Sequence, residues 1–147
     1  MYGNTTDLTA YATARGVTIT GDLAVLLVNA HDYIESLSYD GARTVSTQAD
    51  SFPRTGLTVD GVDLDSATVP QRVIDAEYAT AISIDQGVDP LATITPGVKR
   101  EKLDVLEVEY QDGASSQSIN RTINALLRPL LASGGAGGGS FRVSAGR

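Results

Sequence analysis

Four parts of the chain carry apolar residues at intervals of three and four positions, the spacing that places side chains on one face of an α-helix. The clearest runs from residue 21 to residue 41. The pattern predicts a mainly helical protein with about four helices. Their expected limits are about residues 6–15, 21–41, 69–86 and 116–132, and in the second helix the buried face consists of Leu23, Leu26, Leu27, Ala30, Tyr33, Ile34 and Leu37.

Residues that commonly begin or end helices support these limits. Asp22 can cap the second helix, because a short acidic side chain accepts hydrogen bonds from the first free backbone N–H groups. Thr5 or Thr6 can cap the first helix in the same way. Pro70 suits the first turn of the third helix, and Pro129 should kink or end the fourth.

Between the second and third helices the helical pattern is lost. Residues 43–66 consist mainly of Ser, Thr, Asp, Gly and Pro, and a connection this long without structure is uncommon unless it binds something. At its centre Phe52, Pro53 and Arg54 combine an aromatic ring with a guanidinium group, a favoured pair at interfaces. We expect this loop to contact a neighbouring subunit or protein. The alternative is that Phe52 packs the loop onto its own domain.

A β-hairpin is predicted over residues 98–111, with its turn at Leu103-Asp104. Its second arm alternates apolar and acidic residues, as a strand with one buried face does. Its first arm is nearly all charge, which protects an edge strand from unwanted pairing. The apolar side chains, expected to pack on the chain's own helices or on a neighbour's hairpin, are Leu106, Val108 and Tyr110; the charged ones, expected to meet complementary charge on an adjacent subunit, are Lys99, Arg100, Glu101 and Lys102.

Length and composition are those of one small domain with an appended arm. The chain has 147 residues, 41% of them apolar, which is enough for a modest core. It has no cysteine, so disulfides and cysteine-based metal sites are excluded. We expect residues 1–132 to form the helical domain. Residues 133–147, with five glycines between positions 134 and 139, should form a C-terminal arm that does not fold alone.

Charge is divided unevenly along the chain, whose net charge is −7. Residues 1–95 carry 13 acidic and 4 basic side chains, whereas residues 96–147 carry 5 acidic and 7 basic ones. From Gly113 onward every charged side chain is an arginine. Such asymmetry suggests two faces with different partners, or simply a mildly basic C-terminal region.

No arrangement of residues favours catalysis. His31, the one histidine, lies within the second expected helix beside Asp32, and no G-x-S-x-G element accompanies it. The acidic segment "DGVDLD" (60–65) lacks the spacing of a calcium loop. Glu107 and Glu109 are explained equally well by alternation on a solvent-exposed strand face. We therefore expect no enzyme activity, no metal site and no cofactor.

Four sequence elements, in their order along the chain, resemble a family of small tailed-phage proteins. The elements are "SFPRTGL" (51–57), "GVKREKLDVLEVEY" (97–110), a helix ending "INALLRPLL" (123–131) and a Gly-rich tail that contains arginine. The family is named for DnaT-like single-stranded-DNA binding, and it is also similar to head–tail connector (adaptor) proteins. The resemblance covers about residues 5–142.

The resemblance implies one of two functions. Binding single-stranded DNA needs a positive groove with aromatic stacking platforms, whereas this chain is acidic and has two Phe residues far apart in sequence. A connector needs a helical wedge, an acidic channel wall that DNA passes without sticking, and extensions that grip neighbours. We favour the connector and keep single-stranded-DNA binding as the alternative.

As a connector, the protein would form a homo-oligomeric, dodecameric ring at the head–tail interface of the virion. The resemblance implies that this ring docks beneath the portal protein, joins the capsid to a downstream neck (stopper) or tail protein, and lets genomic DNA pass without sequence-specific binding. The chain shows no signal-peptide pattern and no apolar run of the ~20 residues that a membrane span needs. We therefore expect a protein made in the host cytoplasm with no membrane partner.

The C-terminal arm is expected to bind the portal. Its glycines provide a hinge that fits where side chains would clash. Phe141 and Val143 alternate with Arg142 and Ser144, which suits the addition of a strand to an exposed sheet edge. Arg142 and Arg147 could then pair with acidic portal residues. The alternative is an arm without any role.

Overall fold

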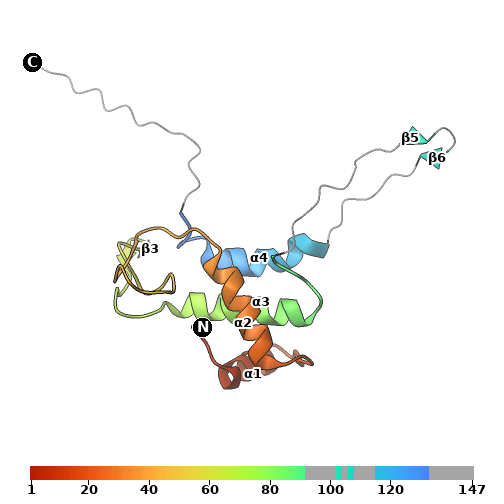
Figure 1. Ribbon diagram of the computed structural model, residues 1–147, viewed down its shortest axis with the longest axis horizontal. Helices are drawn as coiled ribbons and strands as arrows, with labels where there is room; N and C mark the ends of the chain where they lie inside the picture. The colour runs from red at the N-terminus through yellow and green to blue at the C-terminus, as the bar shows by residue number, and fades with distance from the viewer. Residues whose placement is uncertain (92–101, 104–105, 108–114, 133–147) are drawn as a thin grey trace, which may run out of the picture.

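The computed structural model describes residues 1–91, 102–103, 106–107 and 115–132 of the chain (Figure 1). Within these residues it contains four helices and three short pairs of antiparallel strands, so the expected mainly helical domain is confirmed. In chain order the elements are α1 (Thr5–Thr13), α2 (Leu23–Glu35), β1 (Ala42–Arg43), β2 (Arg54–Thr55), β3 (Thr58–Val59), β4 (Val62–Asp63), α3 (Gln71–Asp85), β5 (Lys102–Leu103), β6 (Leu106–Glu107) and α4 (Ser115–Leu127).

Helix α3 is the centre of the fold. It contacts α1, α2 and α4, and in Figure 1 α4 and α1 lie on opposite sides of it. One face of α3 places Tyr78 and Ala81 in a core cluster with residues of α1 and α2. The other face places Val73 and Ala76 in a second cluster with residues of α2, α4 and the 43–66 segment. A helix buried on two faces leaves little surface for charged side chains.

The helix limits follow from capping residues, as expected, with shifts of a few positions. The Asp22 side chain accepts hydrogen bonds from the first N–H groups of α2, which confirms its predicted cap. The cap of α1 is Asn4, one residue before the expected Thr5. Helix α4 ends at Leu127, two residues before Pro129. None of the helices in the described part of the chain is both long and apolar enough to cross a bilayer.

Helix α2 ends earlier than expected because the residues that follow it pair with the end of α4. The Asp40 N–H donates to the Leu130 carbonyl at 2.9 Å, and the Ala132 N–H donates to the Ser38 carbonyl at 3.0 Å. Between these bonds the Tyr39 side chain enters the core, where it is 8% exposed. The last described residue, Ala132, therefore lies beside the end of α2.

The segment 43–66 is ordered, so the expectation of a structureless loop is wrong. Strand β1 pairs antiparallel with β2, and β3 pairs with β4 in a hairpin. The hairpin turns at Asp60 and Gly61, which both have positive φ (53° and 79°), as a two-residue type I′ turn requires. Gly41 also has positive φ (68°), and a side chain there would collide with the Thr55 carbonyl oxygen.

The predicted hairpin ahead of α4 is confirmed over the four residues that the structure describes there. Lys102 pairs with Glu107 and Leu103 with Leu106. Leu103, expected in the turn, is therefore itself a paired strand residue. The outer parts of both predicted arms, which include Lys99, Arg100, Glu101, Val108, Glu109 and Tyr110, lie outside the described residues.

Asp85, at the end of α3, ties that helix to the segment before α2. Its carboxylate accepts the Gly21 N–H at 2.7 Å and the Thr20 N–H at 3.1 Å. These bonds, that of Thr20 first, lower the pKa of Asp85, because they stabilise the charged form. A lowered pKa stabilises the fold above the ordinary value of about 3.9, and this contribution is lost as pH falls through the lowered pKa.

We therefore expect the Asp85→Asn variant to be less stable than wild type at pH 7, and we expect this gap to narrow as pH falls below about 3.9. Urea unfolding of both proteins across this pH range measures the difference. The control is Asp32→Asn, which changes an exposed carboxylate on α2. A stability gap for Asp85→Asn that is independent of pH would contradict the role of the charge.

Candidate functional site

The predicted contact residue Phe52 lies inside the chain's own core. Its side chain is 3% exposed and belongs to the cluster that α2, α3 and α4 share. Its ring meets that of Tyr39 edge to face, with centroids 4.8 Å apart, and that of Tyr2 at 5.9 Å. The expectation of an exposed aromatic at Phe52 is therefore wrong. Packing of the 43–66 segment onto its own domain, the alternative considered for this residue, is what the structure shows.

Arg54 is also used within the chain. Its guanidinium donates to three backbone carbonyls in the turn after α2, those of Asp40 (2.7 Å), Tyr39 (3.2 Å) and Gly41 (2.8 Å), and to the Ser51 carbonyl (3.2 Å). A lysine has no planar fork that could reach several acceptors in this way. Arg54 thus fastens the 43–66 segment to the end of α2. The neighbouring Pro53 follows a cis peptide bond and is half-buried.

A concentrated polar cluster surrounds Glu77, in the middle of α3. Glu77 is 0% exposed. Its carboxylate accepts the Gly3 N–H at 2.6 Å, the Tyr2 N–H at 3.2 Å and the Nδ1 of His31 at 2.9 Å. The other ring nitrogen of His31, Nε2, lies 3.4 Å from Asp50 Oδ1. Gly3 is required here, because a side chain at this position would collide with the Tyr78 ring.

Tyr2 connects this cluster to the 43–66 segment. Its hydroxyl donates to Glu35 and accepts the Phe52 N–H at 3.0 Å. The second oxygen of Glu35 accepts the Ser51 N–H at 2.7 Å. Burial first, and then the hydrogen bond to Glu35, raise the pKa of Tyr2 far above its usual value. The hydroxyl therefore keeps its proton and remains a donor to Glu35.

The cluster of Tyr2, His31, Glu35 and Glu77 holds the N-terminal segment, α2, α3 and the 43–66 segment together. The buried carboxylate of Glu77 has three hydrogen-bond partners, as buried charge requires, and the partly buried carboxylate of Glu35 has two. His31 lies within α2, as expected, and its side chain is 13% exposed. Among the described residues no group of three or more potential ligands could hold a metal ion. We interpret the cluster as a structural network.

Glu77 is a functional residue of the fold that was not predicted, although the sequence contains an indication of its burial. The residues three and four positions away on either side are Val73, Ile74, Thr80 and Ala81, all apolar or small. A lone carboxylate in such a stripe of a helix must be buried, and it then needs donors from other elements. Those donors come from residues 2, 3 and 31, and nothing in the sequence connects them to position 77.

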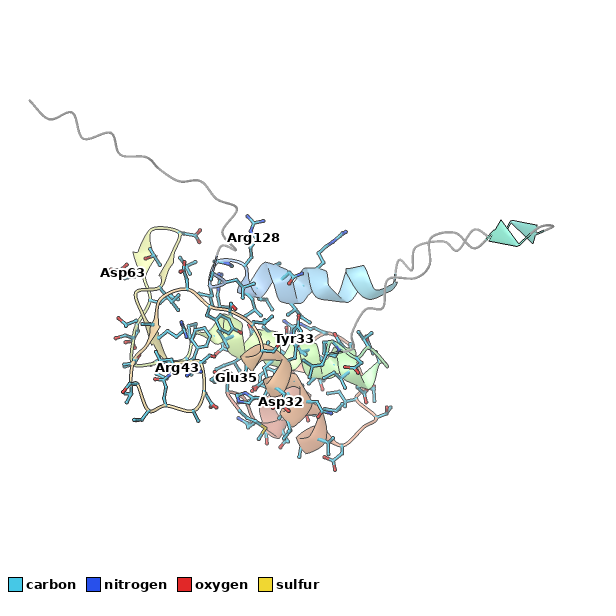
Figure 2. The ribbon with its side chains drawn as sticks, turned by 45° about the horizontal axis from the view of Figure 1, so that its top comes forward. Asp32, Tyr33, Glu35, Arg43, Asp63 and Arg128 are labelled. Carbon is cyan, nitrogen blue, oxygen red and sulfur yellow. The ribbon has the colours of Figure 1, made fainter. Side chains whose placement is uncertain are left out.

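Helix α4 and the residue after it carry an exposed basic surface. Arg121 and Arg128, seven residues and so about two turns apart, are exposed on this helix together with Asn124 between them. Figure 2 shows Arg128 at the end of α4, directed away from the body. The residues from 115 to 132 contain no carboxylate. We call this basic surface the arginine face of α4.

The remaining predicted contact residues lie mostly outside the described residues. Of the charged arm, only the backbone of Lys102 is described, in β5. The residues proposed for the portal, Phe141, Arg142, Val143 and Arg147, belong to the undescribed 133–147 segment. The structure therefore brings none of the predicted contact residues together in one exposed site.

Fold and polar cluster together define a small helical domain held by a buried hydrogen-bond network. The family model described as "Putative DnaT-like ssDNA binding protein" matches residues 1–147, and the chain belongs to this family. The DnaT-like family expected from the four sequence elements is thereby confirmed, whereas its expected likeness to head–tail connectors stays a prediction. No curated protein and no solved structure matches the chain.

Proposed function

We propose that this protein acts by assembling with copies of itself, and that the assembly is the ring of a head–tail connector beneath the portal of a tailed phage. The observation that carries self-assembly is the β5–β6 pair. Among the described elements these strands, like those of the other two pairs, contact only each other, but the other two pairs belong to a segment whose Phe52 and Leu57 lie in the core. An isolated two-stranded hairpin is marginally stable in water at best. A second copy is the partner that would cover its apolar residues, Leu103 and Leu106.

The charge of the body agrees with this proposal. Residues 1–91 carry 13 acidic and 4 basic side chains, and two of these arginines, Arg54 and Arg15, are held by the chain's own carbonyls and by the Tyr11 ring. Such a surface repels phosphate, which suits a channel wall that DNA passes without sticking. The connector identity itself is supported by the order of the sequence elements alone. In this proposal the C-terminal arm, with Phe141 and Arg142, binds the portal.

The family match favours a second candidate function, binding of single-stranded DNA. The arginine face of α4 is where the described chain could contact phosphates. Two phosphate contacts, from Arg121 and Arg128, predict an affinity that falls about sevenfold between 50 and 200 mM salt. This face has no aromatic residue between positions 121 and 132 on which bases could stack, and stacking supplies much of the affinity in known single-strand binders.

One pair of measurements separates the two functions. We expect the full-length protein to form rings in analytical ultracentrifugation and negative-stain images, and to leave the anisotropy of a labelled oligothymidine unchanged at 200 mM salt. Leu106→Asp should reduce ring formation with unchanged helicity, whereas the matched exposed change Thr122→Asp on α4 should not. A protein that stays monomeric, binds the oligonucleotide and loses this binding in Arg121→Ala/Arg128→Ala would overturn self-assembly in favour of the second candidate.

A further inference from the structure

The outer face of α2 carries two exposed valines between two carboxylates. The side chains of Val25 and Val28 are 55% and 47% exposed, although valine is a residue that proteins usually bury. Asp22 comes three residues before Val25, and Asp32 comes four residues after Val28, so the four side chains follow one face of the helix. Among the described elements α2 contacts only α1 and α3. We call these four residues the valine strip of α2.

An open hollow beside the valine strip extends its apolar surface. The hollow has a volume of about 480 Å³ and lies between Asn29 of α2 and the end of α3, where Ile84, Val88 and Leu91 line it. Asn29 lies about one turn from Val25 on the same side of the helix. The side chain of Leu91 is 51% exposed. Adjacent exposed apolar residues with a polar rim are typical of a surface that contacts another protein.

The surroundings of the valine strip are acidic. Residues 16–42 and 73–91, which include all of α2 and most of α3, contain no lysine and no arginine. Asp32 takes part in no ion pair within the described chain. Two copies that met through their valine strips would place carboxylates against carboxylates, and such a contact between like charges is unfavourable. A basic surface is therefore the partner that the strip fits.

The arginine face of α4 has the complementary pattern. Arg121 and Arg128 lie two turns apart, and the exposed residues between them on this face, Asn124 and Ala125, are uncharged. Neither arginine takes part in an ion pair within the described chain. Among the described elements α4 contacts only α3, and Figure 2 shows Arg128 directed away from the body while Asp32 lies lower in the view, on α2. The two surfaces therefore do not meet within one copy.

Three other arginines of the described chain fit the strip less well. The guanidinium of Arg54 is held by backbone carbonyls, and that of Arg15 lies over the Tyr11 ring. Arg43 is exposed, but it is a single cation on the short strand β1. A strip with a carboxylate at each end is matched better by two cations on one rigid helix, because both pairs then form in a single orientation.

We propose that the valine strip of one copy binds the arginine face of α4 of a second copy. This inference rests on the proposed self-assembly and adds a contact separate from the β5–β6 pair. Asp22 and Asp32 are ten residues apart, about 15 Å along α2, and Arg121 and Arg128 are seven residues apart, about 10 Å along α4. The long arginine side chains cover this difference, so that each guanidinium meets a carboxylate while Ala125 lies over the valines.

The contact joins different surfaces of the two copies. Such a head-to-tail interface repeats around a ring when the rotation between copies closes. Complementary charge determines which surfaces meet and in what orientation. The valines and the neighbouring hollow supply apolar surface that the contact removes from water.

Charge changes on both surfaces test the contact in the full-length chain. Val28→Lys places a cation in the valine strip, and Arg121→Glu/Arg128→Glu reverses the charge of the arginine face. Each variant should associate about tenfold or more weakly than wild type in analytical ultracentrifugation. Lysine favours helices more than valine does, so Val28→Lys should keep its circular dichroism spectrum. The matched control is Thr122→Glu, because Thr122 lies about 100° around the helix from Arg121 and therefore off this face.

A mixing experiment separates this contact from that of the β5–β6 pair. Both surface variants are made in the Leu106→Asp chain, in which the hairpin contact is weakened. Each should then be monomeric alone, whereas an equimolar mixture should form a dimer. The reason is that the Val28→Lys copy keeps an intact arginine face and the other copy keeps an intact valine strip. A mixture that stays monomeric would overturn the contact.

The outcomes also distinguish this inference from the proposed function. Asp32→Asn, at the edge of the strip, serves as a control for unfolding at concentrations at which the chain is monomeric. If wild type assembles and the surface variants assemble equally well, the contact is overturned while self-assembly stands. If wild type stays monomeric, both are overturned. If Val28→Lys lowers the urea midpoint of the monomer, another part of the same chain covers the strip, and the inference is wrong.

Discussion

Replacing Phe52 by alanine is expected to reduce the free energy of unfolding by about 3–5 kcal/mol, the usual cost of truncating a buried aromatic ring. Phe52 is 3% exposed, and its ring packs edge to face on Tyr39. Its backbone N–H is held by the Tyr2 hydroxyl, so the surroundings cannot collapse freely into the cavity. A small domain has only about 5–15 kcal/mol of total stability. The variant should therefore be partly unfolded at physiological temperature.

Urea unfolding followed by circular dichroism measures this loss. The control is Val62→Ala in the same segment, because Val62 is 67% exposed and its truncation should change stability by less than about 0.5 kcal/mol. The Phe52→Ala protein could instead keep its unfolding midpoint and fail to assemble. That result would contradict the buried position of Phe52 and would indicate a contact between subunits.

The helices could be predicted because their burial repeats along the sequence. In α2, Leu26, Leu27, Ala30 and Ile34 are all buried, and each belongs to the face that the spacing of three and four indicated. The end of this helix could not be predicted from the same pattern. It depends on a backbone bridge between Tyr39 and Leu131, and contacts between residues so far apart in sequence leave no periodic trace.

The ordered structure of the 43–66 segment was not predicted, and particular residues show why. Strands of two residues are too short to display alternation, so β1 to β4 leave no pattern of period two. The dipeptide Asp60-Gly61 does indicate a hairpin turn, and reading it would have identified β3 and β4. The hydrogen bonds of Arg54 could not be predicted from the sequence, because its acceptors are backbone carbonyls that every residue possesses.

The buried network around Glu77 gives the second large effect. Glu77→Ala is expected to cost about 3–5 kcal/mol, as for a buried charged network from which one partner is removed. The change leaves the N–H groups of Tyr2 and Gly3 and the His31 ring without their acceptor in a site closed to water. Glu77→Gln keeps one oxygen acceptor, so its cost should be smaller than that of alanine. Part of the cost should remain, because the amide introduces two donors.

In Glu77→Ala, unfolding should begin at the N-terminal segment rather than in the whole domain at once. Among the described elements helix α1 contacts only α2 and α3, and its connection to Glu77 runs through Tyr2 and Gly3. Hydrogen exchange should therefore show lost protection over residues 5–13 at urea concentrations where α3 and α4 remain protected. Asp32→Asn, which changes an exposed carboxylate, should leave both exchange and stability unchanged. If α1 kept its protection in Glu77→Ala, the apolar contacts of Leu8 and Ala12 would be sufficient to hold the helix. The buried carboxylate would then have another role, such as fixing the position of Tyr2 against the 43–66 segment.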